Sequence, residues 1–316
     1  MNSTRRGASS RWLLPVLIVL LPAFAAAPTA SAAFPGRNGL IAMGRDLDDG
    51  SRPILTMRPN GHDLTRITHG DGVHGLLEWS PDGRQITFTL DDCSIGFVDA
   101  DGSNYRVLPP EDPTSIPGED ICDGDSSFFP DGQHVVYDHY DIRADRGALI
   151  EMRLDGSDRH VLIADACCDP NVSPDGTKIS FRRDDPLVVA NLDGSGEHQV
   201  SPDWIVGIKT DWAPDGSRLV YWASGDPGPD DLTNVYSVKP DGTDLTQLTQ
   251  FTDPHFRVSG TGYSPDGQWI LFKLQRTDLG LNAFYRMRPD GSELKRISDW
   301  LEWAPRQIDW GAAPDH

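Results

Sequence analysis

The string WSPDGRQITF, from Trp79 to Phe88, decides how this chain folds, because four close copies of it follow. The copies are FFPDGQHVVY (Phe128 to Tyr137), VSPDGTKISF (Val172 to Phe181), WAPDGSRLVY (Trp212 to Tyr221) and YSPDGQWILF (Tyr263 to Phe272). In Ser-Pro-Asp-Gly, proline fixes φ at about −65° and glycine takes the left-handed φ that closes a turn. The apolar residues that follow alternate with period two, as in a half-buried strand. Each copy therefore predicts two antiparallel strands joined by a tight turn.

A second motif, a strand-like run ending in Asp-Gly or Asn-Gly, alternates with the first and occurs six times. Its copies are TMRPNGHDL, FVDADGSNY, EMRLDGSDR, VANLDGSGE, SVKPDGTDL and RMRPDGSEL. The missing sixth copy of the first motif is divided between the chain ends. QIDWG places Trp310 where Trp79 lies in its repeat, and PGRNGLIAM places Ile41 where Ile86 lies.

This repeat pattern predicts an all-β fold, a six-bladed β-propeller with four strands per blade. The spacing of the copies falls in the range of four-stranded blades, and one such blade cannot bury both of its faces alone. Joining the split repeat pairs a C-terminal strand with an N-terminal strand in one blade, which closes the ring and leaves no free edge. The apolar position shared by Trp79, Trp212 and Trp310 is expected to be core.

Composition excludes several classes of protein. Of the 316 residues, 38% are hydrophobic and 24% are charged, which fits neither a disordered chain nor a multi-pass membrane protein. The formal net charge is −20, and such a chain repels phosphate backbones and anionic lipids. We therefore expect no nucleic-acid partner.

The first residues carry the pattern of an export signal. Arg5, Arg6 and Arg11 form a basic segment, an apolar stretch from 12 to 27 is broken by two prolines, and Ala30-Ser31-Ala32 fits a signal-peptidase site. The apolar stretch is shorter than the roughly 20 residues of a spanning helix, although an uncleaved anchor is the alternative. We predict a signal peptide at 1–32, one propeller domain at 33–316, no membrane span in the mature chain, and a secreted or cell-envelope location.

These motifs resemble the TolB-type six-bladed propellers, whose blades carry WSPDG followed by a strand and a DG turn. The resemblance covers the whole mature chain and implies an exported propeller. TolB has an α/β domain before its propeller, whereas the repeats of this chain begin at about Phe34, so we do not expect a Tol–Pal role. Related propellers gate prolyl peptidases, but their G-x-S-x-G nucleophile motif does not occur in this sequence.

Export makes the four cysteines candidates for disulfides, and no C-x-x-C pair starts a zinc site. The first choice pairs Cys93 with Cys122 and Cys167 with its neighbour Cys168. The alternatives pair Cys93 with Cys167 or with Cys168. We expect these bonds to be structural, because the neighbours in sequence are aspartates rather than thiolate-stabilising cations.

Candidate binding residues lie in the irregular segments that enter the inner strands, which gather on one face of a propeller. Exposed aromatic residues there would make a binding surface, and packing against the next blade is the competing interpretation. The candidates are His74, Trp204, His255, Phe256, Trp300 and Trp303.

Metal and catalytic motifs are weak in this sequence. The histidines placed to reach the axis are His69, His74, His139 and His255, and no histidine position repeats from blade to blade. Asp46, Asp48 and Asp49 faintly echo a calcium loop, and the acidic run from Glu119 to Asp125 is expected to be a solvated loop. We assign no catalytic residue, no metal site and no cofactor.

The sequence thus favours a non-catalytic, TolB-like scaffold of the cell envelope, monomeric, that binds a protein or other macromolecule through one propeller face. The alternative is a secreted lyase- or lactonase-type enzyme acting on a polysaccharide or lactone in the axial pocket. A sensor domain for a small ligand is a third class that composition leaves open.

Overall fold

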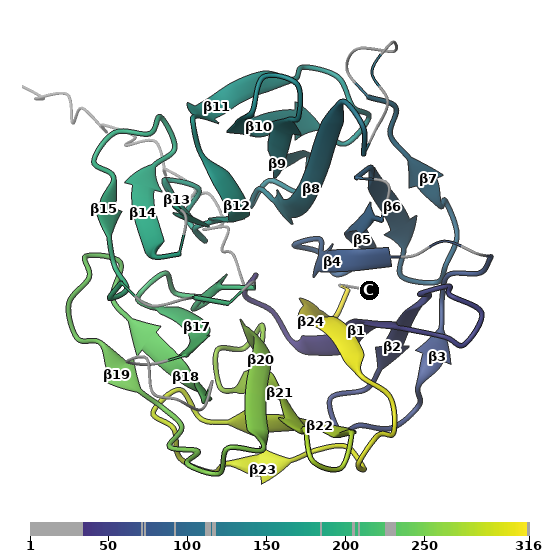
Figure 1. Ribbon diagram of the computed structural model, residues 1–316, viewed down its shortest axis with the longest axis vertical. Helices are drawn as coiled ribbons and strands as arrows, with labels where there is room; N and C mark the ends of the chain where they lie inside the picture. Colours follow the sequence, from purple (N-terminus) through teal and green to yellow (C-terminus); the bar gives the residue numbers. More distant parts are fainter. Residues whose placement is uncertain are drawn as a thin grey trace, which may run out of the picture.

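Six antiparallel sheets of four strands each stand as blades around a central axis in the computed structural model (Figure 1). The structure describes residues 34–314 except 71, 73, 92, 111–114, 116–117, 184, 204–205, 208 and 225–231. None of the described residues is helical, and accordingly no described segment forms a helix able to span a bilayer. The prediction of an all-β, six-bladed propeller is confirmed. The predicted signal peptide lies outside the described residues.

The strands are numbered along the chain. For each blade, the innermost strand, which lies at the axis, is named first and the outermost strand last. Blade 1 contains β24 (Pro305–Ala312), β1 (Asn38–Arg45), β2 (Ile54–Met57) and β3 (Thr65–Arg66). Blade 2 contains β4 (His74–Trp79), β5 (Gln85–Leu90), β6 (Ile95–Asp99) and β7 (Arg106–Val107). Blade 3 contains β8 (Ile121–Phe128), β9 (His134–Asp141), β10 (Arg146–Arg153) and β11 (His160–Ala164).

The other three blades repeat this order. Blade 4 contains β12 (Cys167–Val172), β13 (Lys178–Arg182), β14 (Leu187–Asn191) and β15 (His198–Gln199). Blade 5 contains β16 (Asp211–Trp212), β17 (Leu219–Ser224), β18 (Thr233–Val238) and β19 (Thr246–Gln247). Blade 6 contains β20 (Phe256–Tyr263), β21 (Ile270–Arg276), β22 (Leu281–Met287) and β23 (Lys295–Arg296).

Blade 1 is built from both ends of the chain. Its innermost strand β24 pairs antiparallel with β1, with Trp310 opposite Ile41 and Ile308 opposite Met43. Figure 1 shows β24, in yellow, beside β1, in purple, at the axis. The inner strand of blade 1 also contacts those of both neighbouring blades, β24 with β4 and β20 with β24, so the ring has no gap at this position.

The SPDG turns have the hydrogen bonds that their sequence predicts. In the turn after β4, the Ser80 hydroxyl accepts the N–H of Gln85 at 2.9 Å and donates to Asp82. Gly83 has φ of +66°, and a Cβ there would lie 1.9 Å from the carbonyl oxygen of Ala312. Glycine is therefore required both for the turn and for the close approach of blades 1 and 2.

The repeated apolar position at the end of each inner strand is core, as expected. Trp79, Trp212 and Trp310 are buried, and the equivalent positions of the other three blades are buried as well: Phe128, Val172 and Tyr263. These side chains pack between adjacent sheets, so each blade completes its core against the next one.

Candidate functional site

Each inner strand, or the segment that leads into it, contains a residue with positive φ at the same place. These residues are Leu76, Asp125, Asp169, Lys209, Gly260 and Gln307. The strand register shifts there in β4, β8, β12, β20 and β24, which marks a β-bulge. Each of the six lines a small cavity of about 20 Å³ at the axis, a neighbouring cavity of about 460 Å³, or both. The bulges therefore direct side chains toward the axis.

Lys209 is the centre of a cluster of charges that closes the axis. Its Nζ lies 3.2 Å from Oδ1 of Asp309 and 3.3 Å from Oε2 of Glu78. Both carboxylates also accept backbone N–H groups of the following blade, since Asp309 accepts from Trp79 at 2.7 Å and Glu78 accepts from Phe128 at 3.2 Å. We call Lys209, Glu78, Asp309, Asp211 and Asp169 the axial hub.

The remaining two carboxylates of the axial hub connect blades in the same way. Asp211 accepts the N–H of Tyr263 at 2.6 Å, and Asp169 accepts the N–H groups of Lys209 and Thr210 at 3.0 and 2.8 Å. The hub and its backbone donors therefore connect all six blades through charge-assisted hydrogen bonds. Cavities of only about 20 Å³ lie on its two sides. The residues that the structure describes leave no room for a substrate at this level of the axis.

Burial controls the titration of the axial hub. It raises the pKa of Glu78 to about 7, although Lys209 opposes this, and it raises the pKa of Asp169 to about 7 with a further contribution from Asp125. The pKa of Asp211 is also raised well above its usual value by burial. Burial alone would lower the pKa of Lys209, but Asp309 and Glu78 outweigh it and keep this ammonium charged.

A larger opening lies on the face where the inner strands begin. This axial funnel is a cavity of about 460 Å³, lined among others by Gly75, Leu76, Asp125, Asp138, Trp222, Lys273 and Arg306. Its walls come from the first residues of the inner strands and the last residues of the second strands. The SPDG turns follow the ends of the inner strands, so they lie on the opposite face.

One wall of the axial funnel is acidic and belongs to blade 3. Burial raises the pKa of Asp125 to about 7, with a contribution from Asp138. Burial likewise raises the pKa of Asp138 to about 7, with contributions from Cys167 and Asp123. Oδ1 of Asp138 is shielded from solvent and has no hydrogen-bond partner among the described residues.

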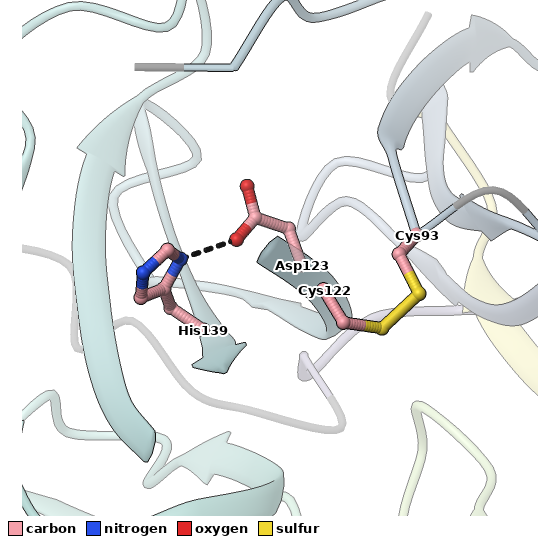
Figure 2. The surroundings of a disulfide bond; sticks show 4 residues. All are labelled: Cys93, Cys122, Asp123 and His139. Atoms are coloured by element: carbon pink, nitrogen blue, oxygen red, sulfur yellow. Dashed lines mark hydrogen bonds and ion pairs between the residues drawn. A yellow bond between two sulfur atoms is a disulfide. The ribbon is translucent and has the colours of Figure 1, made fainter. Parts of the chain in front are cut away.

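A separate cavity of about 440 Å³ opens over blade 3 and contains a histidine–carboxylate pair. Nδ1 of His139 lies 2.6 Å from Oδ1 of Asp123, and Figure 2 shows the pair beside the disulfide. Arg146 and Asp141 line the same cavity. This arrangement orients an imidazole toward a space large enough for a small molecule.

The cysteines follow the first predicted connectivity in part. Cys93, between β5 and β6, is bonded to Cys122 in β8, which ties blade 2 to blade 3 (Figure 2). Cys167 and Cys168 form no disulfide with each other, so the predicted vicinal bond is absent from this structure. Their sulfur atoms contact through a hydrogen bond instead, and this contact and burial raise the pKa of the Cys168 thiol.

Three of the six predicted binding residues pack against neighbours instead of lining the axial funnel. Phe256 contacts the ring of Phe251, Trp300 contacts that of Tyr285, and the guanidinium of Arg45 lies 4.7 Å from the ring of Trp303. His255 is exposed. Trp204 lies outside the described residues; of His74 only the backbone, at the start of β4, is described.

The acidic segments singled out in the sequence have structural partners. Asp46 pairs with Arg306, and Asp49 accepts the N–H and hydroxyl of Ser51. The run from Glu119 to Asp125 is not a solvated loop, because it enters strand β8 at Ile121. No three His, Cys, Asp or Glu side chains in the described part of the chain lie close enough together to hold a metal ion.

Sequence reasoning missed the axial hub and the charged walls of the axial funnel. One signal was present: an acidic residue directly precedes the repeated tryptophan in Glu78-Trp79, Asp211-Trp212 and Asp309-Trp310. Because side chains alternate along a strand, a residue next to a buried tryptophan faces away from the core. In an inner strand, that direction is the axis.

The raised pKa values predict an unusual dependence of stability on pH. Glu78, Asp125, Asp138 and Asp169 have a pKa of about 7 in the folded chain, against about 4 in the unfolded chain. Between these values the folded state binds more protons, so the free energy of unfolding falls as the pH rises toward about 7. Thermal unfolding at constant ionic strength should give a melting temperature several degrees higher at about pH 5 than at about pH 8.

The exposed aspartates in the turns limit this gain in stability at acidic pH. Hydrogen bonds from Ser103 and Ser157 lower the pKa of Asp101 and Asp155, and the stabilisation that they provide is lost as the pH falls below about 4. Asp138→Asn should reduce the difference between the two melting temperatures. A melting temperature that rises steadily from about pH 5 to about pH 8 contradicts the prediction.

Comparison with known proteins identifies the fold. No family model matches this sequence. An uncharacterised protein from Agrobacterium fabrum is 31% identical over 147 residues, which is 43% of this chain. The match spans 46% of that protein, so it extends over about half of the curated relative's length.

Similar proteins are more numerous among the solved structures than among the sequence relatives. A putative TolB from Agrobacterium tumefaciens superimposes over 85% of this chain and 90% of its own, with a TM-score of 0.61 and 14% identity. TolB from Acinetobacter baumannii covers 88% of this chain and 67% of its own, with a TM-score of 0.68 and 15% identity. An oligogalacturonate lyase in complex with manganese covers 79% of this chain and 72% of its own, with a TM-score of 0.54 and 18% identity. These likenesses confirm a TolB-type propeller fold, and at such identities they show the fold alone.

Proposed function

We propose that this chain is an exported, non-catalytic propeller of the cell envelope that binds a protein partner through the face where the axial funnel opens. Residues 1–32 would be its export signal and residues 33–316 a single domain that works as a monomer. The observation that carries the proposal is the closed axis. The charged side chains of the axial hub are used to join blades, and they leave no space for a substrate beneath the axial funnel.

The shape of the axial funnel supports this assignment. The opposite face is formed by the short SPDG and DG turns, whose aspartates are occupied in hydrogen bonds within the turns. The funnel face instead carries a depression with apolar residues such as Leu76 and Leu90 beside charged ones. Concave surfaces with apolar walls and a few charged groups are typical binding sites.

Filling the axial funnel provides a direct test. Gly75 lines it without a positive φ, and a Cβ there would meet only Nη1 of Arg52, at 3.6 Å. Gly75→Phe should therefore fold normally and reduce recovery of the partner by about tenfold or more in cross-linking from the envelope fraction. The matched control is Gln133→Phe, a position in the SPDG turn on the opposite face. If the two variants and the unmodified chain recover the same proteins in equal amounts, the proposed binding face is wrong.

A second candidate, an enzyme acting on a polysaccharide or lactone, is favoured by the His139–Asp123 pair in its cavity of about 440 Å³. One of the similar structures is an oligogalacturonate lyase. Turnover of oligogalacturonides or of a lactone by the purified chain, abolished by His139→Gln, would favour this candidate over the scaffold.

A further inference from the structure

The acidic wall of the axial funnel contains carboxylates that the protein itself leaves incompletely paired. Asp138 follows the core residue Tyr137 in β9, and its Oδ1 has no partner among the described residues. Asp125 accepts one long hydrogen bond, from the N–H of Asp169 at 3.4 Å, and the charges of Arg182 and Lys209 offset its burial only in part. Burying carboxylates with so few donors is unfavourable unless a cation completes them.

The opposite, basic wall of the axial funnel is formed by Lys273 and Arg306, and its donors have few hydrogen-bond acceptors among the described residues. Lys273 in β21 donates one hydrogen bond, to the carbonyl of Pro305 at 2.9 Å, although an ammonium has three N–H donors. Burial and the neighbouring Arg306 lower the pKa of Lys273 to about 8. Arg306 pairs with Asp46 outside the cavity and also lines the funnel. No carboxylate of the described residues lies within ion-pair distance of Lys273.

The two walls face each other across the axis. Asp125 and Asp138 belong to blade 3, whereas Lys273 belongs to blade 6 and Arg306 to blade 1. In a ring of six blades, blade 3 lies opposite blade 6, and Figure 1 shows β8 and β20 on opposite sides of the centre. The acidic and basic groups do not pair with each other, and a cavity of about 460 Å³ separates them.

We propose that the axial funnel binds a short zwitterionic peptide. Its ammonium group would lie against Asp125 and Asp138, and its carboxylate would lie against Lys273 and Arg306. Leu76, Trp222 and the other apolar residues between the walls would contact its middle. An extended chain spans about 3.3–3.6 Å per residue, so a short peptide carries its two charged ends farther apart than a single α-amino acid does.

This inference is independent of the protein partner. It concerns a small ligand and is tested on the purified chain alone, so failure of one proposal leaves the other standing. A chain that captures a partner through its funnel face but binds no peptide would contradict only the present inference.

The test is calorimetric titration of the full chain with dialanine, trialanine and tetraalanine near neutral pH. At least one should bind, and both blocked forms of the best ligand should bind about tenfold or more weakly. The blocked forms are the N-acetyl peptide, which lacks the ammonium, and the C-terminal amide, which lacks the carboxylate. Failure of all three peptides to bind, or equal affinity of free and blocked forms, overturns the inference.

Two variants assign the two ends of the ligand. Asp138→Asn should lose most of its preference for the free over the N-acetyl peptide, since only Asp125 remains on that wall, and it should still prefer the free carboxylate over the amide. Lys273→Gln should show the reverse selectivity. The control Lys178→Gln removes a lysine that bonds Asn191 at the far end of β13, and it should leave both preferences intact. Unchanged selectivity in the two funnel variants, with melting temperatures showing that they are folded, would place the peptide elsewhere and overturn the assignment.

The affinity should also follow a bell-shaped pH profile. Around Asp138 lie the carboxylates of Asp123, Asp125 and Asp169 and the thiol of Cys167; around Lys273 lie Arg306 and Asp46. Ionisation of Asp138 favours the ligand's ammonium, so affinity should rise as the pH approaches about 7. Deprotonation of Lys273 should then lower it above about 8. Asp138→Asn should weaken the acidic limb of the profile, to which Asp125 also contributes. Lys273→Gln should leave only the fall in affinity that deprotonation of the ligand's own α-ammonium causes at about pH 8. A profile that is flat in the unmodified chain contradicts the charge assignment.

Discussion

Lys209→Met should destabilise the fold by about 3–5 kcal/mol at about pH 8, the largest effect that we expect from a single substitution. Methionine keeps most of the length of the lysine side chain but removes the charge that lies between Glu78 and Asp309. The carboxylates of the axial hub are buried, so they lose a partner that water cannot replace. Urea or thermal denaturation measures the difference in the free energy of unfolding.

The dependence of this loss on pH distinguishes the charge from the packing of the side chain. Because the pKa of Glu78 is raised to about 7, this carboxyl is largely protonated at about pH 5 and needs Lys209 less. The cost of Lys209→Met should therefore shrink on acidification, whereas a packing defect would persist unchanged. An effect below about 1 kcal/mol at about pH 8 would mean that the axial hub does not hold the blades together.

The control is Lys239→Met at the surface. Nζ of Lys239 lies 3.5 Å from Asp244, and both side chains are about half exposed, at 48% and 53%. Water screens such a pair, so its removal should leave the free energy of unfolding almost unchanged. The contrast between the two lysines isolates burial as the cause of the large effect.

The fold could be predicted from the sequence because it depends on local chemistry that recurs. The SPDG turn needs only a proline, a glycine and a side chain such as Ser80 to accept backbone N–H groups, and all of these lie within six residues. The repeated apolar position next to the turn then identifies the core. Five copies of one pattern leave little freedom in the number of blades.

The charged groups of the axis could not be predicted in the same way, since they come together from different blades. Lys209 lies in an irregular segment before the short strand β16, and its partners Glu78 and Asp309 are 131 and 100 residues away in sequence. Which residues meet depends on the bulge in each inner strand, and the six bulge positions have no single side-chain type in common. A shift of one residue would turn these side chains away from the axis.

The aromatic candidates were open to two interpretations, binding or packing, and the neighbours of two of them favour packing. Phe256 and Trp303 do lie in segments that enter inner strands, as predicted. Each is covered by a neighbouring ring or guanidinium, however, at 5.6 Å from Phe251 and 4.7 Å from Arg45. The sequence places such residues at the correct end of a strand but does not say whether another side chain reaches them first.

Removal of the Cys93–Cys122 disulfide should cost about 3–4 kcal/mol, the second large effect that we expect. The bond joins residues 29 apart in sequence, and the entropy that it removes from the unfolded chain corresponds to this value. It also holds the start of β8 beside blade 2, where the N–H of Asp123 donates to the carbonyl of Cys93 at 3.1 Å. The double variant Cys93→Ser/Cys122→Ser should therefore unfold at a lower temperature than the unmodified chain under oxidising conditions.

The second pair of cysteines provides the matched control and settles the origin of any redox sensitivity. Cys167 and Cys168 are half-buried and form no disulfide, so Cys167→Ser/Cys168→Ser should change the free energy of unfolding by about 1 kcal/mol or less. A reductant should lower the stability of the unmodified chain and of this control equally, and should leave Cys93→Ser/Cys122→Ser unaffected. If reduction instead destabilises the Cys93→Ser/Cys122→Ser variant, a bond between Cys167 and Cys168 forms in solution and contributes to the fold. Equal stability of all three chains under oxidising conditions would show that the link between blades 2 and 3 is dispensable, because the contacts of β8 with β4 and β5 already hold them together.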